Sequence, residues 1–354
     1  MEHSINEKPK IIFLINDSKG YNGGARPLVN WAKSLSDRSI LLSIGKNKNL
    51  SLPNLVYIDS ISKVIDIAKK YEFILVSDNN IKNGMKIAMK AKIKLAVYCQ
   101  IPVGLHALGV GGNEGVRTKK LLYFLLKLVP FSILSYNYRK YLKKANYVIS
   151  NSLNMEVLLN FVYGIVNTEL LLPPIDSDKF VMLNHSIKDS ITVFVGRNGD
   201  LNDFGVMKKI IEIGLKYKLN VNILGSMNLS KHEILRNKNV KILENITDSQ
   251  LIEVYSKSYV TICIQKQEYF GYVPIESILC GTPSITLYHH NVVDIYPNFK
   301  EYLIFSESSN LSYRLMDLIE RELKEGFIVD LDYVKALFSI EKSKNDLLTL
   351  IGIQ

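Results

Sequence analysis

The sequence is poor in cysteine, and that scarcity limits the structures it can form. Only Cys99, Cys263 and Cys280 occur among its 354 residues. Three widely spaced cysteines are too few for a disulfide framework, and their spacing fits no cysteine-ligated metal site. We therefore expect three buried thiols in a reduced, cytoplasmic environment.

Long hydrophobic runs and targeting signals are also missing. No apolar run reaches the length of a membrane span, and the polar segment Met1–Lys10 does not resemble a signal peptide. The chain has no close internal repeat and no low-complexity tract. A hydrophobic content of 47% over 354 residues is enough for two ordinary domains with large cores, which argues against disorder.

The positive charge is unevenly distributed along the chain. Residues 1–172 contain 24 Lys and Arg against 11 Asp and Glu, whereas residues 173–354 contain 20 against 23. The net charge of +10 therefore comes from the first half. This excess indicates either an anionic surface or acceptor that faces the first half, or only a lysine-rich composition. Nucleic-acid binding is a weaker third interpretation, because no recognition helix or aromatic RNA-binding signature is present.

Short apolar runs alternate with helical patterns in the first half, which predicts a doubly wound α/β domain. The run at 10–15 is continuous, as in a buried parallel strand, and a loop at 20–24 and a helix at 26–35 follow it. The further strands expected in this half are at 40–44, 73–76, 95–98 and 147–150.

A second α/β series follows the double proline Pro173-Pro174, where we place the domain boundary. Its expected strands are at 191–195, 220–224, 240–243, 260–264 and 284–287. The predicted domains are an acceptor-side domain over residues 1–172 and a donor-binding domain over 173–335. Residues 336–354 are expected to form a helix that packs back on the first domain.

The most informative motif lies between Glu268 and Pro283. Two carboxylates, Glu268 and Glu276, stand eight positions apart around a Phe-Gly turn, and the helix that follows is expected to stop at Gly281-Thr282-Pro283. We expect Glu276 in the first turn of that helix. Carboxylates can accept hydrogen bonds from sugar and ribose hydroxyls, while the N–H groups of a helix start suit an anion. The alternative is a loop with two solvated glutamates before a core helix.

This motif closely resembles the E-x7-E signature of retaining GT-B glycosyltransferases of family four, the glycosyl transferases group 1. The resemblance implies an α/β fold of two Rossmann-like, doubly wound domains that face each other across a cleft. It implies that Glu268 contacts the transferred sugar together with the backbone N–H groups of Phe270 and Gly271. It also implies that Glu276 accepts hydrogen bonds from the ribose.

The same resemblance assigns a diphosphate site to the start of the second domain. Arg197 follows a predicted strand, where an arginine can form paired hydrogen bonds with a phosphate. The family usually has Lys-Gly about six residues later, but this chain has Asp203-Phe204-Gly205. The second cation is then either Lys208 or absent. Gly225, at the end of the next predicted strand, completes the expected donor-binding residues of this domain.

In the first domain, Gly23 and Gly24 resemble the family's Gly-Gly-Ala loop, which lies across the donor diphosphate. Glycines there let the backbone approach a ligand closely. Gln100 stands where the family often has a histidine, and His106 lies nearby in the sequence. The predicted catalytic residues are therefore Glu268, Arg197 and His106, although a lone histidine such as His106 is more often structural.

No metal site or cofactor is predicted. The triplet Asp176-Ser177-Asp178 has the Asp-x-Asp pattern of metal sites, but we interpret it as a turn, and His289-His290 lacks partners at ligand spacing. Arginine, lysine and helix dipoles can stabilise a departing diphosphate without a metal.

The sequence thus predicts a metal-independent, retaining hexosyltransferase in glycan or lipid-linked oligosaccharide assembly, with a UDP-sugar favoured over a GDP-sugar. The alternative is a non-catalytic nucleotide-sugar-binding protein of the same fold. We expect the protein in the cytoplasm. The apolar residues 121–131 and the aromatic and basic residues 136–144 form either a peripheral contact with an anionic membrane surface or a core helix with a solvated continuation.

Overall fold

The computed structural model describes residues 11–16, 24–44, 52–100, 133, 135–184, 186–196, 204–225, 233–265, 270–287, 303–306, 310–326 and 331–353. Contacts divide the chain into two compact units. Among the described residues, the first unit holds 11–100, 133–176 and 338–353, and the second holds 177–337. The division after Asp176 lies four residues beyond the boundary expected from the double proline.

The first unit is built on a seven-stranded sheet with the order β3-β2-β1-β4-β5-β6-β7, in which every neighbouring pair is parallel. Its strands are β1 (Ile11–Asn16), β2 (Ser39–Ile44), β3 (Leu55–Ile58), β4 (Phe73–Ser77), β5 (Lys94–Cys99), β6 (Tyr147–Ser150) and β7 (Glu169–Leu170). Its helices are α1 (Arg26–Ser34), α2 (Ile61–Ala68), η1 (Asp78–Asn80), α3 (Ile81–Ala91), α6 (Tyr136–Leu142), α7 (Leu153–Val157), η3 (Leu158–Val162) and α14 (Ile340–Ile351).

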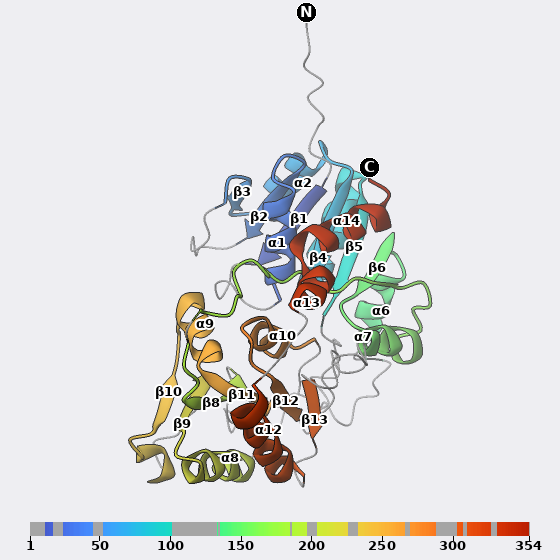
Figure 1. Ribbon diagram of the computed structural model, residues 1–354. Coiled ribbons are helices and arrows are strands. Elements are labelled where there is room, and N and C mark those ends of the chain that lie inside the picture. The colour runs from blue at the N-terminus through green and yellow to red at the C-terminus, as the bar shows by residue number, and fades with distance from the viewer. Residues whose placement is uncertain are drawn as a thin grey trace, which may run out of the picture. The chain divides into compact units, whose positions relative to one another are not determined.

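Helices cover both faces of this sheet, which explains why its strands are apolar on both sides. Alternate residues of β1 enter different cores. Ile11 and Phe13 pack in the core that contains α1 and α14, whereas Ile12 and Leu14 pack with α2, α3 and α6. The architecture is therefore the doubly wound α/β arrangement predicted from the apolar runs (Figure 1).

The last helix, α14, belongs to the first unit and packs against α1 (Figure 1). The Trp31 indole donates a hydrogen bond to Ser343 Oγ at 3.0 Å, and Ser343 Oγ donates to the Leu172 carbonyl at 3.1 Å. Ile175 N–H donates to the Phe338 carbonyl at 2.8 Å. These bonds attach residues 172–175 and the C-terminal segment to the same core.

The second unit is built on a six-stranded parallel sheet with the order β10-β9-β8-β11-β12-β13. Its strands are β8 (Ser190–Gly196), β9 (Asn220–Gly225), β10 (Val240–Leu243), β11 (Ser258–Cys263), β12 (Ser284–Leu287) and β13 (Leu303–Ser306). Its helices are α8 (Phe204–Lys216), η5 (Glu233–Arg236), α9 (Asp248–Ser256), α10 (Tyr272–Leu279), α12 (Leu311–Glu325) and α13 (Leu331–Phe338), which ends at the division between the units.

The two faces of the second sheet differ in chemistry. One face packs aliphatic side chains such as Ile191 and Val193 against α8 and α12. The other carries hydroxyl groups: Thr192 Oγ1 and Ser258 Oγ lie 2.7 Å apart, and Ser277 of α10 donates to Thr261 Oγ1 at 2.8 Å. Buried polar groups need partners, and these direct bonds fix α10 on the sheet more specifically than apolar contact alone would.

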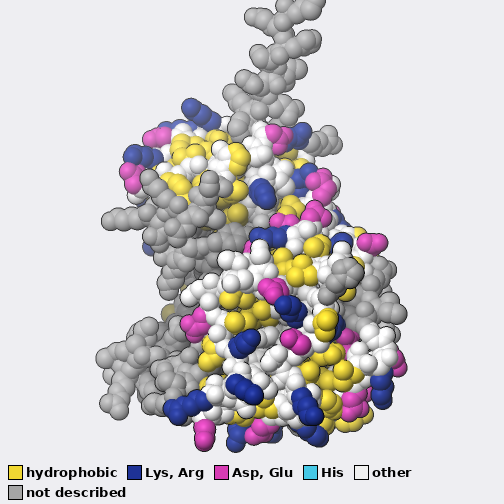
Figure 2. All heavy atoms as spheres, turned by 60° about the vertical axis from the view of Figure 1, so that its left-hand side comes forward, with side chains coloured by type: hydrophobic (Ala, Val, Ile, Leu, Met, Phe, Trp, Pro, Cys, Tyr) yellow, Lys and Arg dark blue, Asp and Glu magenta, His cyan; other side chains and the backbone are white. Residues whose placement is uncertain are grey.

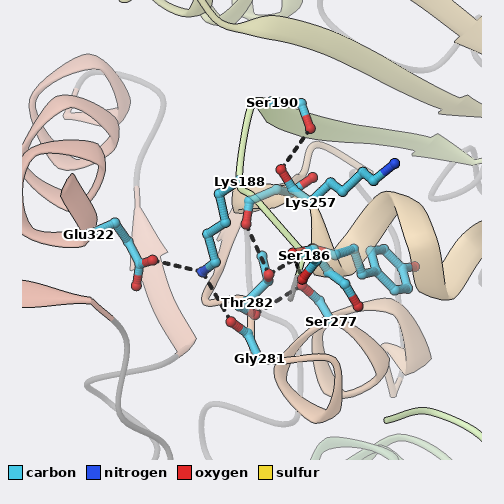
Figure 3. A network of polar contacts seen from close by, with 11 residues as sticks. Ser186, Lys188, Ser190, Lys257, Ser277, Gly281, Thr282 and Glu322 are labelled. Atoms are coloured by element: carbon cyan, nitrogen blue, oxygen red, sulfur yellow. Dashed lines mark hydrogen bonds and ion pairs between the residues drawn. The ribbon is translucent and has the colours of Figure 1, made fainter. Parts of the chain in front are cut away.

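A polar network joins the amino-terminal edge of this sheet to α10 and α12 (Figure 3). Lys188 Nζ donates to Glu322 Oε2 of α12 at 2.7 Å and to the Gly281 carbonyl at 3.1 Å. Thr282 Oγ1 lies 2.7 Å from the Tyr255 carbonyl and 3.0 Å from that of Ser258. This network lies at the edge opposite the carboxyl ends of the strands.

Each strand predicted from an apolar run is confirmed to within two residues at each end. The strands β3, β7 and β13 were not predicted.

The three cysteines are buried and free, as expected. On the face drawn in Figure 2, Lys and Arg side chains of the second unit lie among those of Asp and Glu. Ion pairs such as Lys257–Glu253 occur in this unit. Within the part of the chain that the structure describes, no helix is long and apolar enough to cross a membrane.

Candidate functional site

Both sheets reverse their strand order beside their first strand. In the second unit β8 lies between β9 and β11, and in the first unit β1 lies between β2 and β4. Loops after such neighbouring strands leave the carboxyl edge in opposite directions, which opens a place for ligands. The residues that follow β8, β9 and β11 are therefore the first candidates for a binding site.

The ends of these three strands approach one another too closely for side chains at two positions. Gly225 has φ +120°, and a Cβ there would lie 2.2 Å from the Gly196 carbonyl oxygen. Gly196 has φ +73°, and a Cβ there would meet the Gln265 side chain at 1.9 Å. Glycine at position 225 lets the backbones of β8 and β9 lie close together directly before Arg197, and the Gln265 side chain fills the space beside Gly196. Gln265, which follows β11, was not predicted as part of this site.

The helix α10 begins at the same edge, after β11. Its N-cap is Gly271, with φ 84° and ψ 76°, a residue that has no side chain to cap the first turn. Phe270 is 2% exposed and its ring packs edge-on against Tyr272, with centroids 5.2 Å apart. A buried ring thus holds the turn, and the N–H groups of the first turn point toward the edge where an anion would be favoured.

Glu276 is buried, with 2% of its surface exposed. The prediction that it lies in the first turn of the helix is wrong. The helix α10 starts earlier than expected, at Tyr272, directly after Gly271 in the left-handed conformation, so Glu276 is the fifth helical residue, in the second turn. Its charge and, above all, burial raise the pKa of the Cys280 thiol, which therefore stays protonated. Its burial on the helix that begins at the carboxyl edge of the sheet makes Glu276 a functional candidate.

Lys208, the proposed second cation, lies on α8 and is about half exposed. Its Nζ is 3.7 Å from Glu212 Oε1, one turn further along the same helix. Phe204, where the family resemblance leads us to look for lysine, is the first residue of α8. The role of Lys208 in donor binding stays a prediction.

The carboxyl edge of the first unit carries Gly24 and a buried acid that sequence reasoning missed. Asp78 directly follows β4 and is 4% exposed. Both of its carboxylate oxygens accept the N–H of Gln100, each at 2.9 Å, and Gln100 Nε2 donates to the Gly24 carbonyl at 2.8 Å. The sequence signal that could have identified Asp78 is its place directly after the strand β4, which neighbours β1 where the strand order reverses.

Comparison with known families identifies the second unit. Residues 181–326 match the family described as Glycosyl transferases group 1. The chain carries a group 1 glycosyltransferase domain. This group 1 domain contains the whole carboxyl edge with Gly196, Gly225, Gly271 and Glu276. Among curated proteins, no match to the chain is found.

Solved structures show that the whole chain has the GT-B fold. HepE of Anabaena in complex with UDP-glucose has a TM-score of 0.71 at 14% identity, covering 97% of this chain and 99% of that chain. Sucrose-phosphate synthase from Thermosynechococcus elongatus has a TM-score of 0.70 at 15% identity, covering 97% and 98%. A glycosyltransferase from Rickettsia africae has a TM-score of 0.69 at 16% identity, covering 97% and 98%. The predicted GT-B fold class is confirmed.

Four predicted site residues lie outside the described residues. Glu268 and Arg197 of the group 1 domain are two of them, and Gly23 and His106 are the others. Phe270, Gly196 and Gly24, which are close in sequence to Glu268, Arg197 and Gly23, are described, and each lies at the carboxyl edge of its own sheet. The roles assigned to all four remain predictions.

The aromatic and basic residues of 136–144 do not all face solvent. Tyr138 is 4% exposed and packs edge-on against Tyr163, with centroids 5.1 Å apart. Arg139 Nε donates to the Tyr163 carbonyl at 3.0 Å. Tyr138 is therefore buried and Arg139 is partly buried, whereas Lys140, Lys143 and Lys144 are exposed. Residues 121–131 lie outside the described residues, so the membrane contact stays a prediction.

Metal-ligating side chains do not gather in the described ranges, where no three His, Cys, Asp or Glu residues come together. The predicted turn at Asp176-Ser177-Asp178 is present over residues 177–179.

Proposed function

We propose that the chain is a retaining hexosyltransferase that moves a sugar from a UDP-sugar to an acceptor hydroxyl in glycan or glycolipid assembly. The bond between the sugar and the diphosphate breaks while the acceptor hydroxyl enters on the same face of the sugar. UDP is favoured as the carrier because HepE was crystallised with UDP-glucose.

The proposed roles follow the chemistry of each group. Glu276 accepts hydrogen bonds from the ribose hydroxyls. Arg197 and the N-terminal end of α10 stabilise the negative charge that develops on the departing diphosphate. Glu268, with the N–H groups of Phe270 and Gly271, orients the sugar. Gly23 and Gly24 contribute backbone contacts to the diphosphate, and no metal takes part.

The observation that carries this proposal is the close approach of the ends of β8 and β9 beside a helix start whose N-cap is glycine. A Cβ at Gly225 would meet the Gly196 carbonyl oxygen, so glycine lets these two strand ends lie together directly before Arg197. The buried carboxylate of Glu276 lies on the same helix. This combination suits a nucleotide diphosphate, which needs N–H donors and a hydroxyl acceptor together.

A second candidate function is nucleotide-sugar binding without transfer. It is favoured by Phe204 at the position where a lysine is expected and by the pairing of Lys208 with Glu212. With one cation fewer, the diphosphate would be held but its departure would be stabilised less.

Donor turnover separates the two candidates. Purified protein is incubated with UDP-glucose, UDP-galactose, UDP-N-acetylglucosamine and GDP-mannose, and release of free nucleotide is measured with and without EDTA. The enzyme hypothesis predicts UDP release that EDTA does not change. The anomeric configuration of the product, read by NMR, tests retention. Donor binding without release under all conditions would favour the binding protein.

Arg197 tests the proposed diphosphate contact. Arg197→Ala should lower turnover by about 2.7–4 kcal/mol in transition-state free energy, the loss typical of one preorganised donor. Arg314→Ala removes an exposed arginine of α12 in the same unit and serves as the control. Turnover of Arg197→Ala equal to that of Arg314→Ala would remove Arg197 from the mechanism.

We also propose that the first unit meets an anionic membrane surface through α6. Lys140, Lys143 and Lys144 are exposed there, and each base near such a surface contributes about 1 kcal/mol. A Lys140/Lys143/Lys144→Ser variant leaves the structural Arg139 intact. Wild type should sediment with anionic vesicles and not with neutral ones, and the variant should bind both weakly. Equal partitioning of wild type onto both vesicles would contradict the proposal.

A further inference from the structure

Three loops of the first unit are tied together at the carboxyl edge of its sheet. Asp78 directly follows β4, Gln100 directly follows β5, and Gly24 lies between β1 and α1. The strands β1, β4 and β5 are consecutive in the sheet (Figure 1), and hydrogen bonds of Gln100 join it to Asp78 and to Gly24. We refer to Asp78, Gln100 and Gly24, with the hydrogen bonds between them, as the loop brace.

Asp78 fixes the backbone where β5 ends. Its two oxygens share the Gln100 N–H at 2.9 Å each, and the Tyr138 hydroxyl donates to Oδ2 at 3.4 Å. Burial raises the pKa of Tyr138 well above its ordinary value and the Asp78 charge raises it further, so the phenol keeps the proton that it donates. A charge-assisted bond to a backbone N–H is among the stronger hydrogen bonds.

Gln100 transmits this fixed position to the glycine loop. Its side-chain amide Nε2 donates to the Gly24 carbonyl at 2.8 Å, a bond between residues 76 positions apart in the sequence. Glycine has the largest backbone freedom of any residue, so a glycine pair needs an external contact to hold one conformation. The amide supplies that contact.

We propose that Asp78 and Gln100 are positioning residues that hold the backbone of Gly24 in place for the donor diphosphate. The inference rests on the proposed function. Gln100 binds the loop through Nε2 and does not ionise, so it acts on loop geometry and not as an acid or base. Asp78 acts through Gln100. A loop already held in its binding conformation has less conformational entropy to lose when the ligand binds.

The test compares Gln100→Met with a matched loss of an amide elsewhere. Gln100→Met keeps the length of the side chain and removes the donor. Asp78→Asn weakens the hydrogen bond that the Gln100 N–H donates to residue 78, and so loosens the position of Gln100 itself. The control is Asn54→Leu, because Asn54 Nδ2 donates to the Ala32 carbonyl at 2.8 Å and to the Ser39 carbonyl at 3.2 Å, at the amino-terminal edge of the same sheet. Thermal midpoints, UDP affinity by calorimetry, and hydrogen exchange of the peptide that contains Gly24 are measured for each.

Gln100→Met should exchange faster in that peptide without any ligand, and its UDP dissociation constant should rise about threefold to tenfold, as expected for one lost hydrogen bond. Turnover at saturating UDP-glucose should be unchanged. Asn54→Leu should lower the thermal midpoint and leave UDP affinity and loop exchange as in wild type.

Two results would overturn the inference: unchanged loop exchange in Gln100→Met, or a loss of saturated turnover with unchanged UDP affinity, which would place Gln100 at the reacting atoms. If wild type bound neither UDP nor UDP-glucose, the proposed function would fail instead, while the exchange measurement would still test the brace.

Discussion

Two buried glutamates of the second unit lie in different surroundings. Glu276, on α10, is 2% exposed near the carboxyl edge of the sheet, whereas Glu322, on α12, is 7% exposed and bonded to Lys188. Glu322 is paired with Lys188 at the amino-terminal edge of the sheet. We assign Glu276 to a ligand because it lies on the helix that begins at the carboxyl edge, where ligands bind in parallel α/β sheets.

Glu276→Gln should weaken UDP binding by about 1.5–3 kcal/mol, because the neutral amide loses a charge-assisted bond to the ribose. Glu322→Gln makes the same chemical change at a second buried glutamate and should bind UDP as wild type does. Calorimetric titration with UDP measures both. Wild-type affinity in Glu276→Gln would show that the ribose assignment is wrong.

Glu322 also predicts a pH effect on stability. Burial raises its pKa in the folded state above the ordinary value of 4.5, although the hydrogen bond from Lys188 opposes the shift. As pH rises from 4.5 through the raised value, the unfolded chain loses this proton first, so the free energy of unfolding falls. Urea unfolding across this range should show that decline in wild type and not in Glu322→Gln.

Glu253 provides a control of opposite sign. The hydrogen bond from Lys257 lowers the pKa of this exposed carboxyl, so its contribution to stability is lost as pH falls through the lowered value. Glu253→Gln should therefore remove a weak acid-side loss of stability. If the difference in the free energy of unfolding between wild type and Glu322→Gln did not change with pH, the raised pKa assigned to Glu322 would be contradicted.

The helix α10 links the donor site to the opposite edge of the sheet. The sequence predicted where this helix ends, since Gly-Thr-Pro is a strong stop signal. Thr282 N–H bonds the Ser277 carbonyl at 3.0 Å and Gly281 N–H bonds the Ile278 carbonyl at 2.9 Å, as in a Schellman motif. Its start was predicted too late, because the left-handed conformation of Gly271, directly after which the helix begins, cannot be read from a Phe-Gly pair alone.

Gly281 tests how this helix end is held. Its φ is +77°, and a Cβ there would lie 2.5 Å from Met182 Sδ. Gly352, after α14, has φ +70° and nothing within 4 Å. Alanine at either position should cost about 1–2 kcal/mol for the left-handed conformation. Gly281→Ala should cost more, because it also displaces Met182.

Urea unfolding compares the two alanine variants, and a Met182→Ala background separates the causes. Met182 is 50% exposed, so its own truncation should cost little. In that background Gly281→Ala should cost no more than Gly352→Ala. If Gly281→Ala still cost more stability than Gly352→Ala in the Met182→Ala background, the contact with Met182 Sδ would not be the reason for the larger cost.

At the scale of the whole chain, local patterns predicted the strands and missed the bonds between distant segments. Continuous apolar runs identified β1, β4 and β8, because strands buried on both faces are apolar at every position. They failed for β3, which is only partly buried, and for the two-residue β7. The loop brace could not be predicted, because strand order, which no local pattern encodes, brings Gln100 to Gly24.

The return of the chain to the first unit is another such long-range feature. Leu347 of α14 is fully buried in the core that contains Trp31, and Trp31 packs edge-on against Tyr98 with centroids 4.9 Å apart. Trp31 is the only tryptophan in the sequence, so its fluorescence reports on the first unit. The C-terminal segment should therefore stabilise that unit.

Leu347→Ala should lower the free energy of unfolding by about 2–5 kcal/mol, the range for truncating a buried leucine, and the loss should appear in the Trp31 fluorescence transition. Leu323→Ala makes the same change at a leucine of α12 that is 54% exposed and should shift stability by less than about 0.5 kcal/mol. A wild-type fluorescence midpoint in Leu347→Ala would mean that α14 does not support the core around Trp31. Removal of residues 340–354 should then also be tolerated.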